Sequence, residues 1–151
     1  MYSKKISVII SFLNEGDELL RTIDSIRATA GNRVDIVVVD DCSDDGRDYE
    51  TELQKYGVLY HRNPERKGSS MGKELGVSLC KTPYFLLLDS HCRMYTPDWL
   101  DRLEKELSKF DAQKTLYCLA CQPFDTEDGE QDMCKPITYG AYMSYKPSCV
   151  F

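Results

Sequence analysis

Apolar residues occur along this chain in short continuous runs, which alternate with segments where they recur every three or four positions. Runs rich in β-branched and aromatic residues predict strands, and these runs lie at 4–12, 34–41, 57–62, 84–89 and 115–120. Helical spacing predicts helices between them, at 14–31, around 49–56, around 71–79 and at 96–110. Gly31 is expected to end the first helix, and Thr96 and Pro97 to begin the last.

The alternation of strand and helix predicts the fold class. Parallel strands need such crossovers, so we expect an α/β fold: an open, mostly parallel sheet with helices on both faces. The run at 34–41 suits a parallel strand covered on both sides, and 84–89 is expected to be buried as well. From residue 122 onward the chain is polar and then tyrosine-rich, with no clear period. We therefore expect one domain at 1–121 and, at 122–151, the start of a further region of a longer chain.

Composition narrows the class of partners. With a net charge of −6 the chain shows no basic face, so a nucleic-acid partner is not expected. No apolar stretch is long enough to span a bilayer, and the opening MYSKKISVIISFLNEG lacks the small-residue cleavage site of a signal peptide. Seven cysteines, an odd number without export features, favour reduced thiols and a cytoplasmic location.

Chemically versatile residues follow the predicted strands, at the edge where open α/β sheets bind ligands. Glu15, Asp40, Asp41 and Asp89 would converge there and repel one another unless a cation joined them. If the chain stays extended, Asp89 and His91 point to the same side. A carboxylate suits Mg²⁺ or Mn²⁺, and an added imidazole favours Mn²⁺ or a later metal. Both motifs also have a purely structural interpretation. Asp89 and His91 could form a turn at the end of the strand in which the imidazole is hydrogen-bonded within the protein, and the Asp40-Asp41 pair could cap the next helix.

The order of the motifs resembles a known family. SVIISFLNE before a helix, IVVVDDCSDDG, an N-x-x-x-x-G loop and a strand ending in Asp-x-His are similar to the nucleotide-binding half of GT-A glycosyltransferases of family 2. The Asp-Ser-His-Cys form, with a tryptophan-containing helix eight residues beyond His91, is closer to the polypeptide N-acetylgalactosaminyltransferases. The resemblance covers roughly residues 4–110.

The resemblance implies a metal-dependent transfer of a sugar from a nucleotide sugar, UDP-linked, to a hydroxyl of a glycan, protein or lipid. Asp89 and His91 would hold Mn²⁺ or Mg²⁺ against the diphosphate, and Asp40 or Asp41 would contact the uracil or ribose. The other residues implied at the nucleotide are Ser11, Phe12, Asn14, Glu15, Arg66, Lys67, Gly68 and Ser90.

The chain departs from the family pattern at several points. Ser11 replaces the usual proline, Lys73 stands where asparagine is frequent, and no histidine follows His91 as a third metal ligand. The resemblance identifies no catalytic base, because the acidic Glu127-Asp128 pair comes too early in the chain. Two rivals remain: a non-catalytic module that binds a nucleotide sugar, and a nucleotidyltransferase. The acidic segment SFLNEGDEL argues against the second, which needs a glycine-rich basic loop there.

Overall fold

The structure is a computed structural model that describes residues 4–109, 117, 119–125 and 129–139. The chain divides into two compact units, Met1–Glu104 and Lys105–Phe151. No helix among the described residues is both long and apolar enough to cross a membrane.

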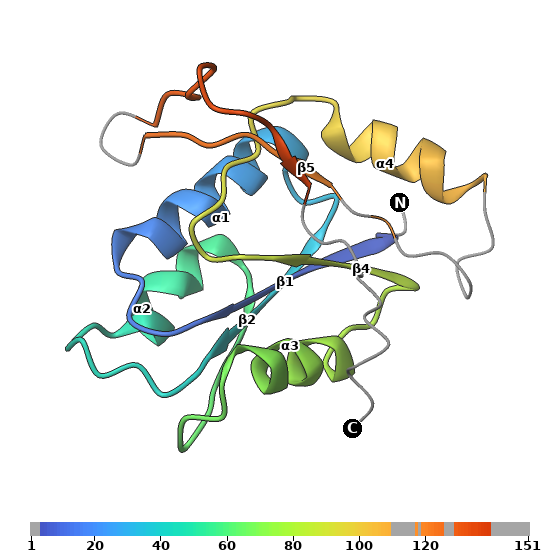
Figure 1. The fold of residues 1–151 in the computed structure, drawn as a ribbon. Helices are drawn as coiled ribbons and strands as arrows, with labels where there is room; N and C mark the ends of the chain where they lie inside the picture. The colour runs from blue at the N-terminus through green and yellow to red at the C-terminus, as the bar shows by residue number, and fades with distance from the viewer. Residues whose placement is uncertain (1–3, 110–116, 118, 126–128, 140–151) are drawn as a thin grey trace, which may run out of the picture. The chain divides into compact units, whose positions relative to one another are not determined.

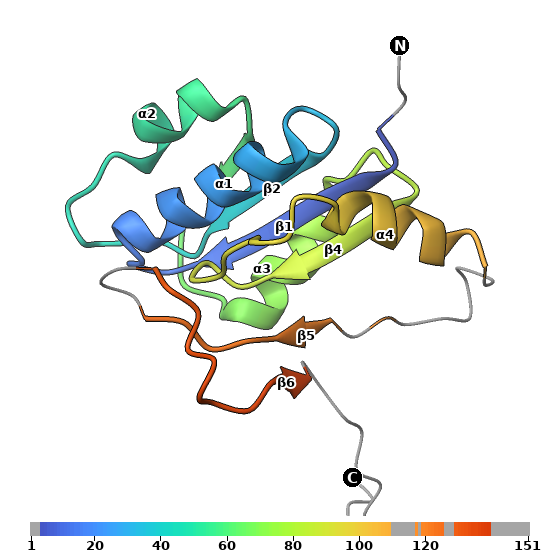
Figure 2. The ribbon, with the colours of Figure 1, turned by 90° about the horizontal axis from the view of Figure 1, so that it is seen from above.

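The first unit is built around a parallel four-stranded sheet with the order β3-β2-β1-β4. Figures 1 and 2 show α1 and α2 on one face of this sheet and α3 on the other, which confirms the predicted fold class. The strands are β1 (Ile6–Phe12), β2 (Asp35–Asp40), β3 (Leu59–Arg62) and β4 (Tyr84–Leu88). The helices are α1 (Asp17–Ala30), α2 (Tyr49–Leu53) followed by the 3₁₀ turn η1 (Gln54–Tyr56), and α3 (Ser69–Ser78). A fourth helix, α4 (Trp99–Leu107), includes the point at which the chain divides.

The elements agree with the predicted ones except near their ends. Gly31 ends α1 with a φ of 57°, a left-handed conformation that glycine adopts without strain. The helix expected at 96–110 begins at Trp99, and the carbonyl of Thr96 accepts a hydrogen bond from its amide. Half of the strand expected at 115–120, namely positions 115, 116 and 118, lies outside the described residues.

The sheet has a continuous apolar centre. β1 is buried along its whole length, and β2 is buried except at Asp35, as expected for a parallel strand covered on both sides. Leu19, Ile23 and Ile26 of α1 are fully buried. On the other face α3 packs closely because Gly72 and Gly76 have no side chain: a Cβ at Gly76 would lie 2.3 Å from Ile9 Cγ2.

The prediction that 84–89 is a buried strand is wrong for the described part of the molecule. β4 is an edge strand of this sheet, with β1 as its one neighbour among the described strands. Phe85 and Leu87 are 51% and 43% exposed. An apolar run shows that a strand has no polar face, but the cover of each face depends on elements elsewhere in the chain.

The second unit contains a small antiparallel pairing. β5 (Ala120–Cys121) pairs with β6 (Thr138–Tyr139), and an isolated bridge joins Phe124 to Gln131. The division of the chain at residue 104 lies earlier than the boundary expected at 121, which stays a prediction.

Candidate functional site

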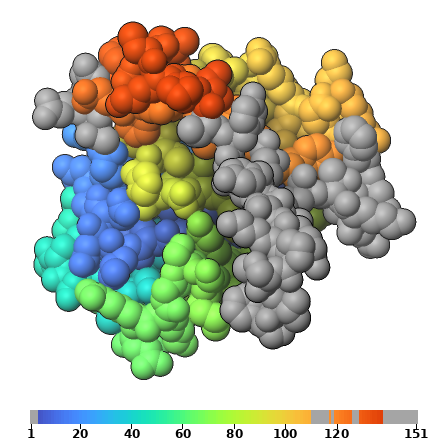
Figure 3. Space-filling view, viewed as in Figure 1, coloured from blue at the N-terminus to red at the C-terminus, as the bar shows by residue number. Residues whose placement is uncertain are grey.

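All four strands of the sheet run in the same direction, so the segments that follow them gather at one edge. Figure 3 shows part of this surface: the chain around the end of β1 (blue) lies against the chain that follows β4 (yellow-green), above the green of α3. This is the edge at which open parallel sheets bind ligands. The common direction of the strands therefore brings the candidate residues to the same edge of the sheet.

Asp40 and Asp41, which the sequence could not tell apart, have different partners. Asp40 is fully buried and accepts hydrogen bonds from the amide of Ser43 (2.7 Å), the hydroxyl of Tyr60 (2.7 Å) and the guanidinium of Arg62 (2.6 Å). Burial, together with the hydrogen bond to Asp40, raises the pKa of Tyr60 above its usual value. Asp40 thus joins the ends of β2 and β3 and leaves no surface for a ligand.

Asp41 holds the loop that precedes α3. Its carboxylate accepts hydrogen bonds from the amides of Lys67 and Gly68, both at 2.8 Å, and from the side chain of Asn63 at 2.9 Å. Burial raises the pKa of this carboxyl, but the three hydrogen bonds and the charge of Arg66 together hold it below its usual value. Asp41 therefore stays ionised and fixes the backbone on which Arg66, Lys67 and Gly68 lie.

Asn14 joins the ends of β1 and β2. Its amide donates to Ser43 Oγ (3.0 Å), its side-chain nitrogen donates to Asp44 Oδ1 (2.7 Å), and its side-chain oxygen accepts from the amide of Asp44 (2.8 Å). Asp44 in turn is paired with Arg66 at 2.7 Å. Asn14 and Cys42 have positive φ angles of 56° and 66°. Asparagine tolerates this left-handed conformation better than most residues, whereas at Cys42 it is strained, and such strain often occurs at functional sites.

The two residues expected to hold a metal ion have different neighbours in the fold. Asp89 Oδ1 lies 2.9 Å from Lys73 Nζ, whereas His91 Nδ1 lies 3.5 Å from Glu15 Oε2. The side chains of Asp89 and His91 are each 58% exposed, so both are open to a ligand. The chain does not stay extended as the alternation argument assumed, because β4 ends at Leu88 and the backbone turns at Ser90 and His91.

Three of the residues implied at the nucleotide are buried. Phe12 packs edge-on against Tyr49, with ring centroids 4.7 Å apart, and Ser90 is 3% exposed. Ser11 is 8% exposed and faces α3, where a Cβ at Gly72 would lie 2.1 Å from its hydroxyl. That hydroxyl has no hydrogen-bond partner among the described residues. These three side chains therefore form the buried layer under the candidate site, whereas Asn14, Glu15, Asp89 and His91 lie at its surface.

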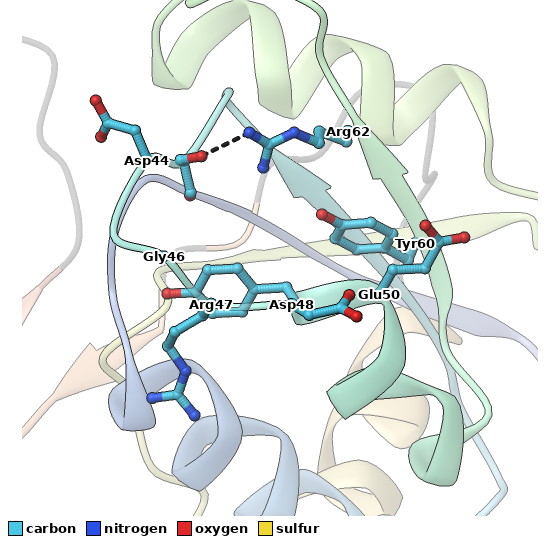
Figure 4. A pocket seen from close by; sticks show the side chains of 9 residues that line it. Asp44, Gly46, Arg47, Asp48, Glu50, Tyr60 and Arg62 are labelled. Atoms are coloured by element: carbon cyan, nitrogen blue, oxygen red, sulfur yellow. Dashed lines mark hydrogen bonds between the residues drawn. The ribbon is translucent and has the colours of Figure 1, made fainter.

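A cavity of about 530 Å³ opens beside this edge, between the loop after β2 and the end of β3 (Figure 4). Its two arginines are already neutralised: Arg62 by Asp40, and Arg47 by Asp17 and Glu52. Burial and a hydrogen bond to Asp45 raise the pKa of Tyr49, in its wall, to about 12. The lining residues are Ser43, Asp44, Gly46, Arg47, Asp48, Tyr49, Glu50, Tyr60 and Arg62.

Sequence reasoning missed the partner of Asp89. Lys73 lies 16 positions earlier, on α3, at a position where asparagine is frequent in the family that the sequence resembles. A basic residue one turn into the helix that precedes an Asp-x-His strand is the signal that could have indicated it. Among the described residues, no three His, Cys, Asp or Glu side chains lie close enough together to hold a metal ion by themselves.

Comparison with known proteins finds relatives among the polypeptide N-acetylgalactosaminyltransferases. The human polypeptide N-acetylgalactosaminyltransferase 14 is 35% identical over 100 residues, which cover 64% of this chain and 18% of that protein. The chain thus spans about a fifth of the length of this curated relative.

Solved structures share the fold. The structure of S. aureus TarS in complex with UDP-GlcNAc matches 70% of this chain and 31% of its own, with a TM-score of 0.62 and 18% identity. The mannosyltransferase PcManGT from Pyrobaculum calidifontis, in complex with GDP-Man and Mn²⁺, matches 80% and 36%, with a TM-score of 0.64 and 19% identity. Both likenesses confirm the GT-A fold.

The sequence profile described as Glycosyl transferase family 2 matches residues 7–145, which includes every strand end that forms the candidate site. The chain belongs to glycosyl transferase family 2.

Proposed function

We propose that this chain is the donor-binding part of a glycosyltransferase that uses a UDP-linked sugar together with Mn²⁺ or Mg²⁺. The observation that carries the proposal is the meeting of the segments after β1 and β4, at Glu15 and His91, beside the loop held by Asp41. The resemblance to GT-A glycosyltransferases implies that the residues at these positions bind the nucleoside, the diphosphate and the metal ion.

The nucleoside is assigned to the surface between Asn14, Asp41 and the 66–68 loop. A carboxylate has about four acceptor sites, and Asp41 uses three of them on Asn63, Lys67 and Gly68. The remaining site suits the N–H of a uracil or a ribose hydroxyl. The crystal structure of TarS with UDP-GlcNAc supports a uridine donor.

The residues at the end of β4 fit a divalent cation by the chemistry of their donor atoms. Asp89 offers an accessible carboxylate, His91 offers an accessible imidazole, and Glu15 lies where it can orient that imidazole or add an oxygen. Because these groups do not form a complete cage, the ion would need oxygen atoms from the diphosphate to complete its coordination. When bound, the ion would supply positive charge where the departing diphosphate gains negative charge.

The acceptor in this proposal is a hydroxyl group of a glycan, protein or lipid. Glu127 and Asp128, the downstream carboxylates considered as a base, lie outside the described residues.

A thermal-shift panel tests the donor assignment. A ligand that binds the folded state raises the stability by RT ln(1 + [L]/Kd). We expect UDP and UDP-sugars with Mn²⁺ to raise the melting temperature more than GDP or CDP do, and EDTA to reverse much of the shift. Glu74→Gln, on the exposed surface of α3, is the control for His91→Ala, which should lose the Mn²⁺-dependent shift. A panel in which no nucleotide stabilises the chain would refute the proposal.

The ion pair between Lys73 and Asp89 favours a second candidate, a module that binds a nucleotide sugar without turnover. In this alternative Lys73 supplies the positive charge at the diphosphate, and Asp89 holds the lysine in place. The two candidates differ in their response to metal. Hydrolysis of a UDP-sugar that requires Mn²⁺ supports the enzyme, whereas nucleotide binding without metal and without hydrolysis supports the module.

A further inference from the structure

One side of α1 carries polar residues although it faces the protein. Glu18, Thr22, Ser25 and Thr29 are spaced by four, three and four positions, so they lie along one stripe of the helix. Thr22 is fully buried. Buried polar groups are normally hydrogen-bonded, so this stripe requires partners.

The partners belong to the segment that follows β4. The hydroxyl of Thr22 lies 2.6 Å from the carbonyl of Ser90 and 2.8 Å from that of Cys92, and it accepts a hydrogen bond from the amide of Cys92 at 3.1 Å. Figures 1 and 2 both show this segment running beside α1. The hydroxyl thus binds backbone groups on both sides of His91.

The rest of the stripe continues the same contact. Glu18 pairs with Arg93 at 2.7 Å, Ser25 Oγ accepts from the amide of Met94 at 3.0 Å, and Thr29 Oγ1 accepts from the indole of Trp99 at 2.9 Å. The carbonyl of Glu15 also accepts from the amide of Glu18. The first turns of α1 therefore fix both residues that meet at the site, Glu15 and His91.

The backbone at His91 needs this support because the sheet no longer provides it. The pairing between β1 and β4 ends at Ile10 and Leu88, and the chain turns directly afterwards.

A valine at position 22 would have a similar shape but would remove the single hydroxyl hydrogen for which the carbonyls of Ser90 and Cys92 compete. The carbonyl of Cys92 would keep its hydrogen bond from Arg93 at 2.9 Å, so the carbonyl of Ser90 would be the one most affected. One hydrogen-bond partner would be enough to stabilise the buried hydroxyl of Thr22. Its contacts with backbone groups on both sides of His91 therefore go beyond what stability requires.

We propose that Thr22 is a positioning residue that sets the orientation of His91 at the metal and diphosphate site. The expected effect on metal binding rests on the proposed function, but the orientation of His91 can be measured without any ligand. Removing groups that orient a metal ligand typically lowers metal affinity about 10–100-fold.

The experiment compares Thr22→Val with Thr22→Ser, which keeps the hydroxyl, and with Thr29→Val, the same change on the same stripe away from His91. The chain has two histidines, His61 and His91, so their ring signals in ¹H–¹⁵N spectra are readily separated. We expect Thr22→Val to move the ring signals of His91 but not those of His61, and to weaken Mn²⁺ binding in the presence of UDP about tenfold. Thr22→Ser should stay within about twofold of wild type, and Thr29→Val should resemble wild type.

Unchanged His91 signals in folded Thr22→Val would overturn the inference, and so would equal effects of Thr22→Val and Thr29→Val. If Thr22→Val does not fold, Thr22→Ala leaves room for a water at the same carbonyls, and its spectra are judged by the same criteria. A wild-type chain that binds neither UDP nor Mn²⁺ would refute the proposed function alone, because the ring signals still report whether Thr22 positions His91.

Discussion

Adjacent residues at the end of β2 have separate tasks because successive side chains of a strand point to opposite faces. Asp40 is directed to Tyr60 and Arg62 of β3, and Asp41 to the loop before α3. The sequence could predict that two carboxylates stand at this edge. It could not assign their roles, because the assignment depends on the register of β2 against β3.

The lowered pKa of Asp41 predicts a pH-dependent contribution to stability. A carboxyl whose pKa is lower in the folded than in the unfolded state stabilises the fold above the unfolded value of about 3.9, and this contribution is lost as the pH falls through the folded value. We expect Asp41→Asn to lower the free energy of unfolding by about 1–3 kcal/mol at neutral pH. Urea unfolding from neutral pH to below about pH 3 should show the difference from wild type shrinking. A difference that stays constant over this range would contradict the account.

The ion pair of Lys73 with Asp89 predicts competition with a metal ion. Lys73→Gln removes a positive charge 2.9 Å from the carboxylate, so Mn²⁺ should bind more tightly in the presence of UDP. Because Asp89 is exposed, the gain should be at most about 1 kcal/mol, or about fivefold. Electron paramagnetic resonance of free Mn²⁺ measures the affinity, with Lys81→Gln, an exposed lysine beyond α3, as the control. Weaker Mn²⁺ binding would show instead that Lys73 assists the site.

At the scale of elements, the contact between α3 and β1 decides where Lys73 and the 66–68 loop lie. Gly72 and Gly76 are one helical turn apart and allow the helix to approach Ser11 and Ile9. Helical spacing predicted α3, but it gave no indication that the two glycines form its contact face. For the same reason the exposure of β4 could not be foreseen: apolar patterns identify elements, not the elements that cover them.

This contact predicts a specific double-mutant result. Gly72→Ala and Gly76→Ala should each destabilise the fold by about 1–3 kcal/mol, because the new methyl group overlaps with β1. Ser11→Ala should recover part of the loss at Gly72, since it removes the hydroxyl that a Cβ there would meet, but none of the loss at Gly76. Urea unfolding measures the stability of the three single variants and of the two double variants that combine Ser11→Ala with Gly72→Ala or with Gly76→Ala. Equal recovery at both glycines would show that the close contact with Ser11 is not the cause.

For the whole molecule, the sequence predicted the parallel α/β sheet and the edge at which the candidate residues gather. Both follow from local patterns and from the common direction of parallel strands. A turn at His91 was one of the two alternatives that the sequence left open, but nothing in the sequence indicated that this turn contacts Thr22, about 70 positions earlier in the chain. Contacts over such separations are set by packing, not by spacing.

The central claim is that Asp89 and His91 bind a divalent cation together with the diphosphate of a nucleotide. It is tested most directly by calorimetric titration of Mn²⁺ with and without saturating UDP, on wild type, Asp89→Asn and the control Glu74→Gln. Because the diphosphate would complete the coordination, we predict that UDP tightens Mn²⁺ binding at least about tenfold and that Mn²⁺ tightens UDP binding by the same factor. The coupling should be retained in Glu74→Gln and lost in Asp89→Asn. Independent binding of UDP and Mn²⁺ by the wild-type chain would contradict the account.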